Sequence, residues 1–271
     1  MSSASTGEAA TSVIVLSDVH GNAAALEAAL AVTDRRRPDQ LVFLGDLLTY
    51  GANPSGVLEQ AWTAADRHPT IFVKGNHDEF YLELAEGRDD LVRALPDWIR
   101  RAVEQTAEEI DLDWLGTDFP FVDSYEFDGA MLAHANPFGP GDWTYLNADE
   151  DWCRAGEVVA SAGLRLGVFG HTHRPFRGVW ADGVVKVRGV GPDPWRLPQG
   201  VVGLVNAGAV GQPRGGPHLA TLVELVFHPG EIDVQFVPLT YDLGRHLAEL
   251  DGWDVPPEVR ARLQSYFKAW A

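Results

Sequence analysis

The sequence predicts an α/β protein built from two packed, mixed β-sheets with helices on their flanks. In the first half, short apolar runs alternate with helical segments, which is the pattern of parallel βαβ units. In the second half, strand-like runs are separated only by short turns, which indicates an antiparallel or mixed second sheet. No repeat, low-complexity block or linker divides the 271 residues. We therefore expect a flexible tail over residues 1–11 and a single domain over residues 12–271.

The first half provides three strands and two helices. The apolar run SVIVL, which begins at Ser12, is typical of a strand covered on both faces. Asn22 is placed to cap a helix that begins AAALEAALAV, a run of strong helix formers. The strand QLVFLG, a helix opened by Pro54 and Ser55, and the strand TIFVKG follow in that order.

The rest of the chain begins with an expected helical insertion over residues 78–116, which Pro96 interrupts with a kink or a boundary. FPFVDSYEF and GAMLAHA are predicted to be two strands joined by a hairpin turn at Asp128-Gly129. A helix (ADEDWCRAGEVVASAG) and a strand (LGVFG) come next. The second sheet is then expected from VVKVRG, VVGLVNAG, HLATLVELVF and EIDVQFVPL, and two short helices from residues 241–271.

Composition narrows the classes of partner. The formal net charge of −18 disfavours long nucleic acids, which are bound by Lys and Arg, and anionic membrane surfaces. A small phosphorylated substrate, a nucleotide included, is compatible with this charge, because metal ions reverse the local field. The single cysteine, Cys153, excludes a disulfide framework. Because we find no secretory signal and no apolar run of the ~20 residues that span a bilayer, we expect a cytoplasmic protein.

Candidate metal ligands follow the predicted strands in five short clusters: Asp18-Val19-His20, Gly45-Asp46, Gly75-Asn76-His77-Asp78, His134, and Gly170-His171-Thr172-His173. Residues two apart share one face of an extended segment, so each Asp-x-His or His-x-His pair is expected to reach one ion. Asp46 could use one carboxylate oxygen toward each of two ions. Mixed oxygen and nitrogen donors suit Mn, Fe, Zn, Co or Ni better than Mg or Ca.

Each cluster alone has an ordinary explanation. An Asp-x-His pair is most often a solvated surface pair, a histidine after a strand is most often hydrogen-bonded structurally, and Gly-Asp is a common turn. The complete set, in order and each at a predicted strand end, favours a two-metal site over coincidence.

The segments SDVHGN, GDLLTYG, KGNHD, LAHANP and GHTH resemble the signature of the calcineurin-like metallophosphoesterases. NAGAVGQPRGG resembles a segment of small prokaryotic members of the phosphodiesterase and phosphatase branches. The resemblance covers residues 12–225 and implies a four-layer α/β/β/α sandwich. It also implies that one metal is held by Asp18, His20, Asp46 and His173, and the other by Asp46, Asn76, His134 and His171.

The resemblance further implies that His77 protonates the leaving oxygen and does not bind metal. Two ions ~3.5–4 Å apart can clamp a phosphoryl group and supply hydroxide from a bridging water.

Arg214, in a Gly-rich loop, is a candidate for binding substrate phosphate, as is Asn76. Asp78 could orient His77 or cap the following helix. Thr49 stands where the Ser/Thr phosphatases carry an Asp, which argues against their mechanism.

We therefore predict a dinuclear metal-dependent phosphoesterase, with phosphodiesters slightly preferred and manganese among the expected metals. The alternatives are a phosphomonoesterase (a nucleotidase or a phosphoprotein phosphatase) and a scaffold of the same fold without activity. A metallo-β-lactamase-type hydrolase is disfavoured because its His-x-His-x-Asp-His cluster is missing.

Aromatic residues flank the site in two segments that the family signature does not include. Trp98 and Trp114 lie in the helical insertion, and Phe138, Trp143 and Tyr145 lie in the loop after His134. One hypothesis is that they form a wall on which a nucleobase or aryl group stacks. The alternative is that they pack these segments onto the core.

Overall fold

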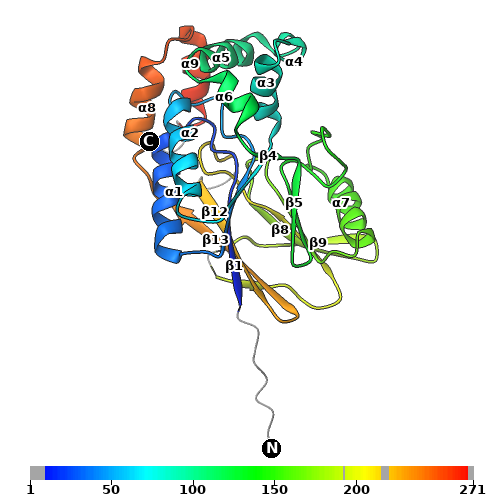
Figure 1. The fold of residues 1–271 in the computed structure, drawn as a ribbon. Coiled ribbons are helices and arrows are strands. Elements are labelled where there is room, and N and C mark those ends of the chain that lie inside the picture. The colour runs from blue at the N-terminus through cyan, green and yellow to red at the C-terminus, as the bar shows by residue number, and fades with distance from the viewer. Residues whose placement is uncertain (1–9, 192, 215–219, 268–271) are drawn as a thin grey trace, which may run out of the picture.

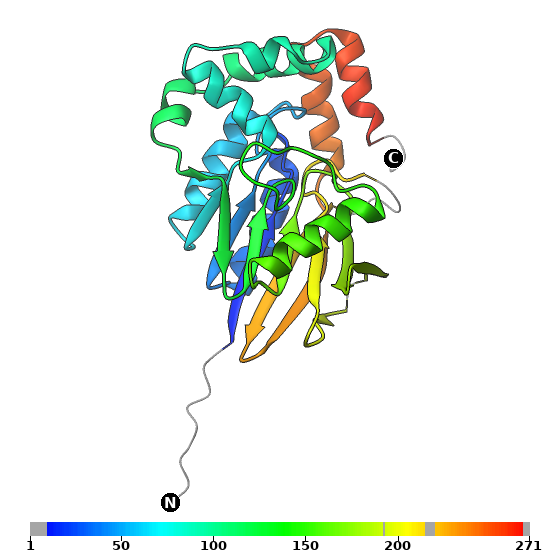
Figure 2. The ribbon, with the colours of Figure 1, turned by 90° about the vertical axis from the view of Figure 1, so that its right-hand side faces the viewer.

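Two β-sheets pack face to face in the computed structural model, which describes residues 10–191, 193–214 and 220–267 (Figure 1). Helices cover the outer face of each sheet, so the layers run helix, sheet, sheet, helix (Figures 1 and 2). The predicted α/β architecture of two mixed, flanked sheets is confirmed. None of the helices in the described ranges is long and apolar enough to span a membrane.

The first sheet has the strand order β10-β13-β12-β1-β2-β3-β4. Its parallel half is the predicted βαβ series, in which β1, β2 and β3 alternate with α1 and α2. Asn22 caps α1 by accepting from the Ala25 amide, and Asn53 caps α2 in the same way ahead of Pro54. The bounds are β1 (Thr11–Leu16), α1 (Ala23–Arg36), β2 (Gln40–Leu44), α2 (Pro54–Ala65), β3 (Thr70–Val73), β4 (Phe121–Val122), β10 (Trp195–Arg196), β12 (Ala220–His228) and β13 (Glu231–Leu239).

The second sheet has the order β5-β6-β7-β11-β8-β9, with α7 across its outer face (Figure 2). The predicted hairpin between β5 and β6 is present, and Asp128 and Gly129 both have positive φ, 44° and 77°, as its turn requires. The bounds are β5 (Ser124–Phe127), β6 (Ala130–Ala133), α7 (Asp149–Ser161), β7 (Leu166–Phe169), β8 (Phe176–Ala181), β9 (Val184–Arg188) and β11 (Val202–Asn206).

Alternation along β1 explains why its sequence is apolar throughout. Val13 and Val15 point into the core between the sheets, whereas Ile14 and Leu16 pack beneath the helices of the outer layer. Both faces of the strand are therefore buried, as expected for the interior of a layered α/β fold. The carboxyl ends of β1, β2, β3, β6 and β7 open into loops that carry the candidate ligands.

Three sequence-based expectations need correction. β12 and β13 belong to the first sheet, because β12 pairs antiparallel with β1. FPFVDSYEF is two strands in different sheets, since β4 continues the first sheet beside β3 and β5 starts the second. β8 and β10 were not anticipated. The tail prediction lies mostly outside the described residues, and Thr11 already belongs to β1.

The helical segment 78–116 is four separate helices. Pro96 is the N-cap of the third, so it marks a boundary as predicted. With the two C-terminal helices, these four gather at the end of the molecule where the strands of the βαβ series terminate (Figure 1). The bounds are α3 (Asn76–Ala85), α4 (Asp90–Arg93), α5 (Asp97–Glu108), α6 (Leu112–Thr117), α8 (Leu243–Gly252) and α9 (Pro257–Ser265).

Candidate metal centre

The loops that follow five strands bring the candidate ligands to one buried place. Asp18, Asp46 and Asn76 come from the first sheet, after β1, β2 and β3. His134 and His171 come from the second sheet, after β6 and β7. The convergence predicted from the order of the clusters is therefore observed, and the centre lies between the sheets.

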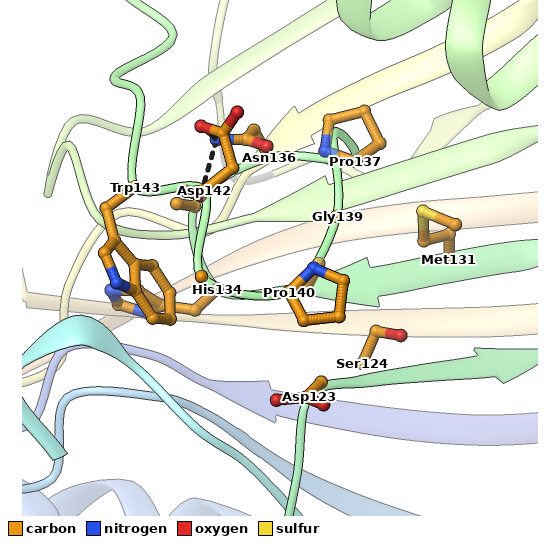
Figure 3. A pocket seen from close by; sticks show the side chains of 13 residues that line it. Asp123, Ser124, Met131, His134, Asn136, Pro137, Gly139, Pro140, Asp142 and Trp143 are labelled. Carbon is orange, nitrogen blue, oxygen red and sulfur yellow. Dashed lines mark hydrogen bonds between the residues drawn. The ribbon is translucent and has the colours of Figure 1, made fainter. Parts of the chain in front are cut away.

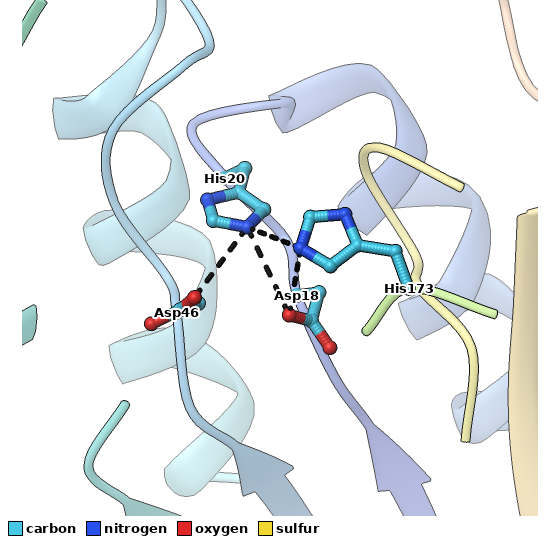
Figure 4. Close-up of side chains that lie close together, drawn as sticks. All are labelled: Asp18, His20, Asp46 and His173. Carbon is cyan, nitrogen blue, oxygen red and sulfur yellow. Dashed lines mark hydrogen bonds and ion pairs between the residues drawn. The ribbon is translucent and has the colours of Figure 1, made fainter. Parts of the chain in front are cut away.

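One group of four side chains has ligand atoms within 4.8 Å of one another: Asp18, His20, Asp46 and His173 (Figure 4). His20 Nε2 lies 3.5 Å from Asp46 Oδ2, and His173 Nε2 lies 3.1 Å from Asp18 Oδ1. All four side chains are buried. The set matches the first of the two ligand sets that the family resemblance implied.

A second group shares Asp46 with the first and adds His134 and His171, again within 4.8 Å. His134 Nε2 lies 3.2 Å from Asp46 Oδ2. The amide of His77 donates to Asp46 Oδ1 at 2.9 Å, which fixes the shared carboxylate against the turn that contains Asn76. Asp46 is thus the one side chain common to both groups.

The hydrogen bonds of the ring nitrogens fix the tautomers of the four histidines. Nδ1 faces the carbonyl oxygen of Leu48 in His20 (3.0 Å), of Leu44 in His134 (2.8 Å) and of Gln212 in His173 (2.6 Å). A carbonyl only accepts, so in each neutral ring Nδ1 carries the hydrogen and Nε2 presents its lone pair. His171 is reversed, because its Nε2 donates to the Trp143 carbonyl at 3.0 Å and the lone pair is therefore on Nδ1. Such backbone acceptors are typical of metal-binding histidines.

Several buried atoms at the centre fit a bound cation. Within the described ranges, Asp18 Oδ1, Asn76 Oδ1 and His134 Nε2 are buried without a hydrogen-bond partner. The lone-pair nitrogens Nε2 of His20 and His173 lie only 3.1 Å apart. Unpaired buried acceptors are costly, and a divalent ion between them removes that cost. The residues present therefore fit a pair of metal ions.

The electrostatics follow from burial and from the shared carboxylates. Burial disfavours the charged form of Asp46, but His134 and His77 nearby hold the pKa of Asp46 well below its usual range. Burial also disfavours the imidazolium of His134, yet the Asp46 carboxylate raises the pKa of His134 to about 10. Burial lowers the pKa of His171 to about 3. The centre is thus a negative site that attracts positive charge.

The backbone conformation at the ligands differs from the extended conformation that the sequence-based argument assumed. Asp18 and His20 have φ of 55° and 49°, and His171 and His173 have 64° and 59°, so neither pair lies in an extended segment. These side chains meet because left-handed residues turn the chain at the strand ends. Asp46, with φ 56°, does the same. Non-glycine residues rarely adopt this region, and such strain concentrates at functional sites.

Two glycines permit the close approach of the loops. A Cβ on Gly75 would collide with the Asp46 carboxylate and amide, and one on Gly170 would collide with Ser17 Oγ and the Asp18 carboxylate. The glycines of KGNHD and GHTH are thus explained by contact with the ligands rather than by positive φ. Any side chain there would displace Asp46 or Asp18.

Asp78 holds the turn between β3 and α3 in place through hydrogen bonds and does not serve as a metal ligand. Its carboxylate accepts from the amides of Asp46 (2.8 Å), Leu47 (2.9 Å) and Gly75 (3.0 Å). The contact with Gly75 caps α3, so the capping alternative is the one observed. Burial, followed by the negative charge of Asp46, raises the pKa of Asp78 to about 7.

His77 lies beside the centre without the features of the four other histidines. Its ring is 5.0 Å from that of His20, edge-on, and 4.6 Å from that of Tyr50. Its Nδ1 is buried and has no hydrogen-bond partner among the described residues. Thr49, at the position where a phosphatase Asp would stand, is engaged with Tyr81 through a 2.6 Å hydroxyl contact.

Arg214 is tied to the centre through its backbone, since its amide donates to the His173 carbonyl at 3.0 Å. Its side chain is half-buried and donates from Nη2 to Gln212 Oε1 at 2.6 Å. The candidate for phosphate binding therefore lies at the edge of the metal centre.

Some of the aromatic residues pack their segments onto the core, and others border the metal centre, where the stacking hypothesis places them. Trp114 packs against Phe119, and Phe138 lies under Arg154, so both serve packing. Tyr145 stacks on His171 at 4.0 Å and is 46% exposed. Trp143, whose indole donates to Glu79 at 2.9 Å, borders a hollow beside His134 that the loop over residues 134–143 encloses (Figure 3).

The sequence did not reveal some of the groups that orient the side chains of the metal centre. The carbonyls of Leu44, Leu48, Gln212 and Trp143 orient the histidines, and a backbone carbonyl has no sequence signal. The ring of Tyr50 contacts both His20 and His77, but its positive φ of 68° and its place in the fold depend on contacts far along the chain.

Comparison with known proteins bears on both the fold and the centre. The sequence model of the calcineurin-like phosphoesterases matches residues 11–175. An uncharacterized protein of Methanocaldococcus jannaschii is 27% identical over 243 residues, which cover 85% of this chain and 88% of that protein. A protein named probable cyclic nucleotide phosphodiesterase, from Rhodopseudomonas palustris, is 28% identical over 189 residues, or 57% of this chain and 65% of that protein.

Solved structures share the architecture. A metallophosphoesterase from Sphaerobacter thermophilus aligns with a TM-score of 0.71 and 24% identity, over 94% of this chain and all 100% of that chain. A hypothetical protein from Pyrococcus horikoshii aligns with a TM-score of 0.70 and 16% identity, over 93% and 97% of the two chains. At these identities the likeness concerns the fold.

Proposed function

Because the chain belongs to the calcineurin-like phosphoesterase family and is a metal-dependent phosphoester hydrolase, we propose that it hydrolyses phosphodiesters with two divalent ions that share Asp46. The observation that carries the proposal is the pair of buried ligand groups with Asp46 in common. The mixture of carboxylate, amide and imidazole donors favours Mn, Fe, Zn, Ni or Co as the ions.

The substrate we propose is a small phosphodiester, nucleotides included. The relative named probable cyclic nucleotide phosphodiesterase supports this class. The net charge of −18 works against long nucleic acids and anionic membranes as partners. A phosphomonoesterase is the alternative within the same chemistry.

The residues divide the work of the reaction. Asp18, His20, Asp46 and His173 would hold one ion, and Asp46, Asn76, His134 and His171 the other. When bound, such a pair polarises phosphoryl oxygens and lowers the pKa of water. Arg214 orients the phosphate from the edge of the centre, and the Asn76 side chain does so from within it. His77 donates a ring proton to the leaving oxygen. Because the centre is buried, few water molecules compete for contact with the bound phosphate.

The test compares metal content with turnover in purified protein. We expect about two metal ions per parent chain, and faster metal-dependent hydrolysis of bis(4-nitrophenyl) phosphate than of 4-nitrophenyl phosphate. Asp46→Ala should lose both ions and the activity, because both ligand groups include this carboxylate. Asp113→Ala, at an exposed position on α6, is the matched control.

Three outcomes would change the proposal. Turnover that is independent of metal and unaltered in Asp46→Ala would favour a scaffold of the same fold. One retained ion in Asp46→Ala would argue against a shared ligand. Faster hydrolysis of the monoester would replace the diesterase with a phosphomonoesterase.

A further inference from the structure

The C-terminal helix α9 presents two side chains toward the neighbourhood of the metal centre. Arg262 and Tyr266, which caps the helix at its C-terminal end, are four residues apart and therefore share one face. The Arg262 guanidinium lies 4.2 Å from the Trp98 ring, and the Arg214 guanidinium lies 5.2 Å from the Tyr266 ring. Both distances are within the range of cation–π attraction.

The contact with Trp98 continues inward to His77. Trp98 stacks on Tyr50 with a 5.6 Å centroid distance and a 14° interplanar angle, and Tyr50 in turn lies 4.6 Å from His77. Leu263 and Val259 of α9 are buried in the same apolar cluster as Tyr50. The helix is therefore seated against the layer of residues that surrounds the proposed proton donor.

Arg214 has donor capacity left for a ligand. Nη2 donates to Gln212, but Nε is buried and has no hydrogen-bond partner within the described parts of the chain. The Nε–H therefore remains available to a phosphate oxygen.

We propose that Tyr266 is a positioning residue whose ring holds the Arg214 guanidinium toward a phosphate oxygen of the substrate at the metal centre. The inference rests on the proposed function and extends it, because it assigns the C-terminal helix to the phosphate-binding site. The backbone bond from Arg214 to His173 fixes one end of the arginine, and the Tyr266 ring fixes the other.

The test is a double-mutant cycle on metal-loaded protein. It measures KM and kcat for bis(4-nitrophenyl) phosphate and the inhibition constant of inorganic phosphate. Arg214→Ala should weaken phosphate inhibition by roughly 10- to 100-fold, the weight of a charged hydrogen bond. Tyr266→Leu should weaken it by roughly 2- to 20-fold, and Tyr266→Phe, which keeps the ring face, should resemble the parent.

The decisive comparison is Tyr266→Leu in the Arg214→Ala background, where it should have no further effect, because the ring then has nothing to position. Metal content should be unaltered in all variants. Glu258→Ala, in the first turn of α9, controls for changes to the helix itself. Tyr266→Met, which keeps more bulk, repeats the cycle if Tyr266→Leu does not fold.

Two results would overturn the inference: parent-like phosphate inhibition in Tyr266→Leu, or an equal effect of this change with and without Arg214. Loss of metal in Tyr266→Leu would also overturn it, since the role would then be structural. These results differ from failure of the proposed function, in which the parent itself would show no metal-dependent hydrolysis.

Discussion

The hydrogen bond on the second ring nitrogen separates the histidines of the centre into two kinds. His20, His134, His171 and His173 each direct one nitrogen at a backbone carbonyl, which leaves the other nitrogen with a lone pair for a cation. His77 has no carbonyl acceptor of this kind among the described contacts at Nδ1. The ring of His77 is therefore not oriented toward a cation by a bond on its opposite nitrogen, which fits the proposed role of presenting an N–H to the substrate.

His77→Ala should therefore keep the metal content of the parent and lower kcat by ~10²–10⁴-fold, the usual contribution of a general acid. His134→Ala should instead lose metal, because His134 Nε2 faces Asp46 at 3.2 Å. Metal analysis and steady-state kinetics on the two variants distinguish the roles, with His228→Ala, at the end of β12, as control. Metal loss in His77→Ala would refute the assignment of His77 as proton donor.

The side chains of the site were predictable, whereas their backbone was not. The clusters around Asp18, Asp46 and His171 could be assigned to one centre because each follows a strand, and strand ends converge. The left-handed φ values at these residues depend on bonds from distant loops, such as the one from the Asp18 amide to the Gly45 carbonyl at 3.1 Å. The types and spacing of the residues do not predict contacts of this kind.

At the scale of elements, local pairings were predictable and distant ones were not. The turn at Asp128-Gly129 defines the hairpin of β5 and β6 by itself. β12 and β13 also form a hairpin, but its membership of the first sheet depends on the pairing of β12 with β1, over 200 residues earlier in the chain. The apolar pattern of β12 is satisfied in either sheet, so the sequence alone does not choose.

The C-terminal helices contain a buried histidine outside the metal centre. His246 of α8 is 1% exposed, and its ring lies edge-on to Phe267 at 4.9 Å. Burial lowers the pKa of His246 to about 4, from an ordinary value of 6.5. The folded state thus favours the neutral ring, and the stability that this provides is present above pH 6.5 and lost as the pH falls toward 4.

His246→Phe should flatten the dependence of unfolding free energy on pH between about 4 and 6.5, by roughly 2–3 kcal/mol relative to the parent. Urea unfolding of both proteins in EDTA at several pH values measures this difference. Subtracting the two curves removes the titration of the site histidines, which both proteins share. If the two curves of unfolding free energy against pH are parallel, protonation of His246 does not destabilise the folded state, and the prediction is wrong.

At the scale of the whole molecule, the metal centre lies where the two sheets meet. Asp18 and Asp46 are carried by loops of the first sheet, Asn76 by the first turn of α3 after β3, and His134 and His171 by loops of the second sheet. Below these loops the sheets are joined by apolar contacts, among them those of Val15, Val42 and Val168. Ions at the centre would add a polar connection at the open end of this interface.

Removal of metal should therefore lower the stability of the entire fold. A ligand at 100 times its Kd stabilises the folded state by about 2.7 kcal/mol, and each kcal/mol is worth about 2–4 °C in Tm for a chain of this size. EDTA should then lower the Tm of the parent by roughly 5–10 °C, as measured by calorimetry. Asp46→Ala, which lacks the shared ligand, should have a Tm that EDTA does not change. An equal decrease in both proteins would mean that EDTA acts elsewhere, and that the sheets are held together by their apolar core alone.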